Sequence, residues 1–141
     1  MSRVIIETLV EGTDLYREIA RIAAQNKVSA GRVTGSGSVQ RARITTCDQK
    51  TMQHATVEVS APMEIVSLYG EVLAHEGKVA PHIHVVLADD RGNGNGGHLT
   101  PDSTPVRSCE IKIEEYATDG TEGSVDIRGR LKNQLQDPIV G

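Results

Sequence analysis

Three histidines are the clearest chemical feature of this sequence. His82 and His84 flank Ile83, and His98 follows the glycine-rich stretch 92–97. On a strand, residues i and i+2 point to the same face, so His82 and His84 project side by side while Ile83 faces a core. One metal ion can bind two such imidazoles at the same time. With His98, from a loop returning to the sheet, they would form a three-histidine site with an open position for water or substrate.

The histidine ligands limit which metal ions this site could bind. Neutral imidazole suits zinc, and also iron, nickel or cobalt. Water bound to such a zinc ion has a pKa of about 7 and can act as a nucleophile or a base. The alternative is that His82, His84 and His98 are surface or interface histidines. His54 and His75 lie next to turns or at polar strand positions, and we expect no ligand role for them.

Two carboxylates lie on the predicted strand 63–73. Glu64 and Glu71 are seven residues apart, which predicts opposite faces and excludes a paired-carboxylate site. Glu71 should share its face with Ile65, Tyr69 and Leu73. It is a candidate general acid or base beside a metal, and the alternative is a paired or edge carboxylate.

The first part of the chain predicts a strand and then a helix. Residues 3–10 are short, apolar and β-branched, as in a strand. Thr13 is the expected N-cap, with Asp14 in the first turn. An apolar stripe at i, i+4, i+7 and i+8 then predicts an amphipathic helix that ends near Asn26. The stripe consists of Leu15, Ile19, Ile22 and Ala23.

The rest of the chain predicts strands with short connections. We expect a turn at Gly35-Ser36-Gly37 and a glycine-rich loop over 89–97. The helix and six to eight strands together predict an α+β fold with a mostly antiparallel sheet. The strand segments are 28–34, 38–46, 54–59, 63–73, 82–88 and 108–114.

Length and composition predict one globular domain. The 141 residues are 38% hydrophobic and 24% charged, and we assign 1–141 to a single domain with a core over about 3–116 and a polar C-terminal segment 117–141. No apolar run approaches the ~20 residues that span a bilayer, and no signal peptide is evident. Cys47 and Cys109 suit a reducing compartment, so we expect a cytoplasmic protein without a membrane partner.

Charge and aromatic content weigh against most nucleic-acid binding. The net charge is −4, and the aromatic residues, 2% of the chain, are all tyrosine. Binding of single strands by base stacking needs aromatic platforms. Arg128-Gly129-Arg130 is similar to the core of a minor-groove AT-hook and gives a candidate contact with double-stranded DNA. The alternative is an exposed basic stretch.

Four stretches in order resemble the PPC (DUF296) domain, which plants and prokaryotes share. The segment His82-Ile-His-Val-Val-Leu-Ala-Asp with Gly96-Gly97-His98-Leu99 resembles its signature. Residues 12–16 resemble the start of its helix, 33–39 its strand–glycine turn and 63–70 its central strand. The resemblance covers about residues 3–116.

The resemblance implies a strongly curved α+β fold that assembles as a homotrimer. The three family histidines map onto His82, His84 and His98, which implies a divalent transition metal, with zinc as the expected ion. The fold is similar to that of acetolactate decarboxylase, which implies a metal-dependent lyase or hydrolase. Plant members occur with AT-hooks in DNA-binding proteins.

Three functional hypotheses follow. The first is a trimeric metal-binding domain that binds or transforms a small carbonyl or carboxylate compound, with Glu71 as acid or base. The second is a DNA-binding regulator or nucleoid-associated protein that uses Arg128 and Arg130. The third is a trimeric scaffold without enzymatic activity.

Overall fold

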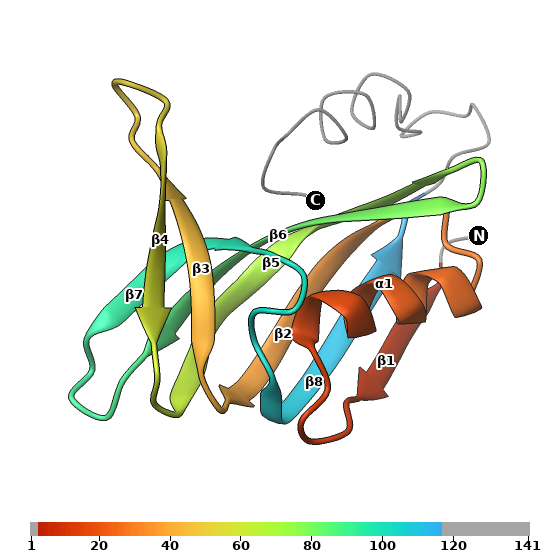
Figure 1. The fold of residues 1–141 in the computed structure, drawn as a ribbon. Coiled ribbons are helices and arrows are strands. Elements are labelled where there is room, and N and C mark those ends of the chain that lie inside the picture. The colour runs from red at the N-terminus through yellow and green to blue at the C-terminus, as the bar shows by residue number, and fades with distance from the viewer. Residues whose placement is uncertain (1–2, 117–141) are drawn as a thin grey trace.

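The computed structural model describes residues 3–116, and in these residues one helix and one antiparallel sheet form the fold, as predicted (Figure 1). Its eight strands pair in the order β1-β8-β2-β5-β6-β7-β3-β4. The elements are β1 (Val4–Thr8), α1 (Leu15–Gln25), β2 (Ala30–Val39), β3 (Ala42–Cys47), β4 (His54–Val59), β5 (Met63–His75), β6 (Lys78–Ala88), β7 (Gly94–Leu99) and β8 (Val106–Glu115).

The core lies between α1 and one face of the sheet (Figure 1). The predicted apolar stripe of the helix is buried there, together with Tyr16. Without Phe or Trp, the core is filled mainly by aliphatic side chains, which pack densely in few rotamers. The sheet contributes, among others, Val33, Leu68, Val72, Ile83, Val85, Leu87, Ile111 and Ile113.

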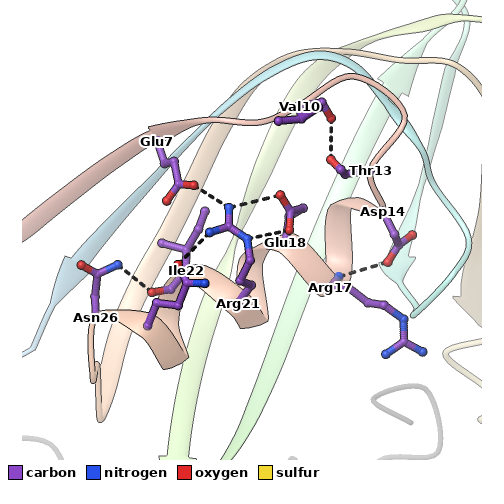
Figure 2. Close-up of polar contacts among 10 residues, drawn as sticks. Glu7, Val10, Thr13, Asp14, Arg17, Glu18, Arg21, Ile22 and Asn26 are labelled. Atoms are coloured by element: carbon purple, nitrogen blue, oxygen red, sulfur yellow. Dashed lines mark hydrogen bonds and ion pairs between the residues drawn. The ribbon is translucent and has the colours of Figure 1, made fainter.

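The helix N-cap is Asp14 rather than Thr13. The Asp14 carboxylate accepts a hydrogen bond from the Arg17 backbone N–H at 3.0 Å, whereas the Thr13 hydroxyl donates back to the Val10 carbonyl (Figure 2). The second carboxylate oxygen of Asp14 accepts from the backbone N–H groups of Ser103 and Thr104. Ser103 and Thr104 are distant in the sequence, and their N–H groups need an acceptor at this point. A carboxylate has two oxygens, so Asp14 can accept these bonds and cap the helix at the same time.

Ion pairs hold the exposed side of α1. The Arg21 guanidinium lies between the carboxylates of Glu18, one turn earlier on the helix, and Glu7 on β1 (Figure 2).

A side-chain hydrogen bond marks the end of the helix near Asn26, as predicted. The Asn26 side-chain amide donates to the Ile22 carbonyl at 2.8 Å.

Two glycine-rich stretches form strands rather than the predicted turn and loop. Gly35-Ser36-Gly37 lies inside β2, with a bulge between Thr34 and Gly37. At Gly37, φ is +125° and an added Cβ would lie 1.9 Å from the Ser108 carbonyl oxygen, so glycine is required there. The second stretch, 94–97, belongs to β7, which pairs with β6.

A bulge in β5 reverses the predicted relation of its two glutamates. The register shifts between Ile65 and Ser67, which leaves Val66 as an extra residue. Glu64 then lies opposite Ala88 and Glu71 opposite His82, six residues apart on β6, so both glutamates share one face. The prediction that they point to opposite faces is wrong, and so is the placement of Ile65 beside Glu71. Six residues of strand, about 20 Å, still separate them.

Other expectations lie partly beyond the described part of the chain. The polar segment 117–141, with Arg128 and Arg130, is outside it, so the domain limits stay a prediction. Across residues 3–116, no helix has the length and apolar character that a membrane crossing requires. Cys109 is buried and Cys47 half-buried, and both thiols are free.

The cap correction can be tested by stability. Replacing Asp14 by Ala (D14A) should lower the free energy of unfolding by about 2 kcal/mol, because three backbone donors lose their acceptor. Thr13→Ala removes one exposed hydroxyl bond and should cost less. Denaturant unfolding of both variants measures the difference, and a larger loss for Thr13→Ala would contradict the assignment.

Candidate metal centre

The hairpin of β6 and β7 brings the three histidines together. On β6, Ile83, Val85 and Leu87 are at most 1% exposed, so the alternating His82 and His84 must face away from the core. His98 lies on β7 directly opposite His84, and opposite Thr45 on β3. The sequence placed His98 on a loop, whereas cross-strand pairing fixes its position.

A tight turn sets the register of this hairpin. The Asp89 carboxylate accepts hydrogen bonds from the backbone N–H groups of Arg91 and Asn93 and from the Asn93 side chain. These donors stabilise the ionised carboxylate and lower the pKa of Asp89. A shift by one residue would turn His98 to the opposite face, so the turn helps to place the third histidine.

The histidine geometry fits a metal site. One ring nitrogen of each of His82, His84 and His98 lies within 4.8 Å of the other two. His82 Nε2 and His98 Nδ1 are 3.0 Å apart. Tetrahedral zinc with Zn–N bonds of 2.0–2.1 Å sets its ligand nitrogens about 3.3 Å apart, so this donor set could hold such an ion.

The remaining histidines, His54 and His75, lie away from this group. His54 begins the edge strand β4, and His75 ends β5 beside the exposed Glu76. Both are exposed and neither joins the three-histidine group.

Glu71 belongs to the same face as the histidines. It lies opposite His82 across β5 and β6, and its Oε1 accepts a hydrogen bond from the Tyr116 hydroxyl at 3.3 Å. Tyr69, opposite His84, stacks on that imidazole with ring centroids 5.3 Å apart. The structure thus brings the sequence-predicted acid or base next to the predicted metal ligands.

A pocket of about 200 Å³ lies beside the histidines. Arg32 on β2 contributes a guanidinium to it, and Tyr69 contributes an exposed aromatic ring. Sequence reasoning missed both residues, because only the register of β2 on β5 and of β5 on β6 places them next to His82 and His84. The full lining is Arg32, Tyr69, Gly70, Glu71, His82 and His84.

Comparison with known families decides the identity of the domain. The model of the Plants and Prokaryotes Conserved (PCC) domain matches residues 1–117. The chain belongs to the PCC domain family. The resemblance to the PPC domain drawn from four sequence stretches is thereby confirmed.

Solved structures share the fold of this PCC domain. A metal-containing protein of Archaeoglobus fulgidus is 31% identical, with a TM-score of 0.72 over 86% of this chain and 90% of its own. A candidate DNA-binding protein of Bacteroides thetaiotaomicron also has a TM-score of 0.72, over 81% of this chain and 79% of its own. At 19% identity, the second likeness concerns the fold alone.

A curated relative carries a similar segment within a longer chain. The bifunctional protein GlmU of Synechococcus sp. (strain JA-2-3B'a(2-13)) is 35% identical over 108 residues. The match spans 76% of this chain but only 16% of that relative, so the similarity concerns one part of GlmU.

Gly70 on β5 lies in close contact with the backbone of β6 beside the site. A Cβ at Gly70 would lie 2.1 Å from the His82 carbonyl oxygen, so Gly70→Ala must separate β5 from β6 at the first histidine. We expect a loss of stability of about 3 kcal/mol and weaker metal binding. The control is Gly94→Ala, whose added Cβ meets only Val86 at 3.6 Å. Thermal melts and metal titrations measure both effects, and wild-type behaviour of Gly70→Ala would contradict the packing argument.

Proposed function

We propose that this PCC domain binds a divalent transition metal, with zinc as the expected ion, through His82, His84 and His98. The observation that carries the proposal is the convergence of three imidazole nitrogens within 4.8 Å on one face of the sheet. The metal-containing relative from Archaeoglobus fulgidus, at 31% identity, supports it. Three histidine ligands leave one position open, as in catalytic rather than structural zinc sites.

The ligand of this site is a small carbonyl or carboxylate compound. The pocket of about 200 Å³ suits a few heavy atoms and opens beside His82 and His84. When bound there, the metal would supply Lewis-acid polarisation of an oxygen atom or a water of lowered pKa. The reaction class is that of a metal-dependent lyase or hydrolase, which the family resemblance implies through its similarity to acetolactate decarboxylase.

Glu71 is the proton carrier in this proposal. Its carboxylate lines the pocket and lies across from His82, within reach of a ligand held at the histidines. The Tyr116 hydroxyl donates to Oε1 and so orients the carboxylate. Glu71 takes a proton from the ligand or from water and returns it to the product.

The PCC domain works as a homotrimer in this proposal. In the described residues, α1 covers one face of the sheet (Figure 1). The opposite face carries exposed apolar side chains. Tyr69 and Val86 on that face are 51% and 39% exposed, and Val66 at the β5 bulge is 62% exposed. Such patches mark interfaces, and other copies of the chain would cover this one.

The other hypotheses have less support. DNA binding was assigned to Arg128 and Arg130, which lie outside the described residues, and the Bacteroides likeness is at the level of fold. The scaffold hypothesis needs the trimer but leaves the histidine cluster without a role. Cytoplasmic location stays a prediction.

Metal analysis tests the central proposal. Tag-free protein purified without chelator should contain about one transition metal per chain, and His98→Ala should lose it, because two imidazoles remain. The matched control His75→Ala changes an exposed histidine outside the cluster and should keep the metal. Elemental analysis reads out all three proteins. Wild-type protein that stays metal-free after zinc reconstitution would refute the site.

The assembly has its own test. The wild-type chain should sediment as three copies, and Val66→Asp should dissociate them, because a charge would be buried in the interface. Val10→Asp alters another exposed valine, in the segment before α1, and should leave the trimer intact. Sedimentation of a monomeric wild type, or of a trimeric Val66→Asp, would contradict this interface.

A further inference from the structure

Arg32 brings a fixed positive charge to the pocket beside the histidines. It lies on β2 opposite Glu71, which lies opposite His82 on β6. Cross-strand partners in an antiparallel sheet point to the same face, so all three side chains share the face of the sheet opposite α1. Arg32 is exposed and lines the same pocket as His82 and His84.

The carboxylates around Arg32 have other partners. Glu71 accepts from the Tyr116 hydroxyl, and Glu114, opposite Arg32 on β8, pairs with Lys112 at 3.2 Å. By contrast, Arg3, Arg17 and Arg21 each form an ion pair. Within residues 3–116, the ion pairs do not include Arg32, so the carboxylates of this part of the chain leave its donors available to a ligand.

The spacing defines what could bind. Neighbouring strands lie about 4.8 Å apart, so the backbones of Arg32 and His82 are about 10 Å apart across β5. The pocket between their side chains has room for a compound of a few heavy atoms. A guanidinium offers two parallel N–H donors that match a carboxylate. A metal held by three imidazoles has one open position, which a second oxygen atom of the same ligand, such as a hydroxyl or carbonyl oxygen, can occupy.

We propose that Arg32 determines ligand specificity by binding the carboxylate of a small 2-hydroxy or 2-oxo monocarboxylate whose second oxygen faces His82, His84 and His98. The inference rests on the proposed metal site. Together with the charge of a bound divalent metal, Arg32 offsets the negative charge of Glu71, which opposes the entry of an anionic ligand. It thereby selects acids over their uncharged analogues.

Matched ligands and variants test this role. Lactate and pyruvate are titrated calorimetrically into zinc-loaded protein, and lactamide, which has the shape of lactate without its charge, is the comparison. We expect both acids to bind and lactamide not to bind. Arg32→Gln should weaken acid binding about 10- to 100-fold, the loss expected for hydrogen bonds to a charged group. Arg32→Lys keeps the positive charge but lacks the two parallel N–H donors. Its affinity for the acids should lie between those of the wild type and Arg32→Gln.

Controls separate this inference from the metal proposal. Arg107→Gln removes an exposed arginine on β8 that lines a different pocket, and it should bind the acids like the wild type. Arg32→Gln should keep its zinc, as read by elemental analysis. Zinc-loaded wild type that binds lactamide as well as lactate, or binds neither acid, overturns the role of Arg32 and leaves the metal site standing. If Arg32→Gln binds the acids as tightly as the wild type, the role of Arg32 is likewise overturned and the metal site stands. Failure to load zinc refutes the metal site itself.

Discussion

Burial of one face of β6 is the constraint on which the rest of this structure depends. Ile83, Val85 and Leu87 complete the core beneath α1, and their burial forces His82 and His84 outward. Because side chains alternate along a strand, this arrangement cannot shift by one residue without bringing the imidazoles of His82 and His84 into the core in place of aliphatic groups. The hydrophobic effect therefore positions the candidate metal ligands, although none of them belongs to the core.

Antiparallel pairing then builds the site outward from β6. The neighbouring strands place His98 opposite His84, Glu71 opposite His82 and Arg32 opposite Glu71. Each step across the sheet adds a different chemical group, from imidazole to carboxylate to guanidinium. The row runs along the face of the sheet opposite α1 (Figure 1), where the pocket beside the histidines lies.

Glycine makes this register attainable. Gly70 lies against the His82 carbonyl, and Gly97 lies against the Thr45 carbonyl, where an added Cβ would be 2.1 and 2.6 Å away. Both positions flank residues of the site, at the contacts of β5 with β6 and of β7 with β3. The glycine-rich stretch before His98 is thus a strand in close contact with its neighbours, and its composition reflects packing rather than loop freedom.

The sequence by itself determined the fold class, the helix and the three histidines that are candidate metal ligands. Strict alternation around Ile83 and the helical stripe from Leu15 to Ala23 are local patterns, and local patterns are readable without neighbours. It did not determine the cap, because Asp14 is chosen by distant donors at Ser103 and Thr104. The sequence pattern also did not predict the bulge at Val66, which places Glu64 and Glu71 on the same face of the sheet.

Only the tertiary structure decided which residues surround the histidines. Arg32, Tyr69 and Glu71 reach the pocket through strand registers that pair positions 11 to 39 residues apart, and register is set by the packing of the whole sheet. His98 was identified from the sequence, but its position was assigned to a loop. Pairing with β6 and β3 places it on a strand, because glycines allow backbones to approach where larger residues would collide.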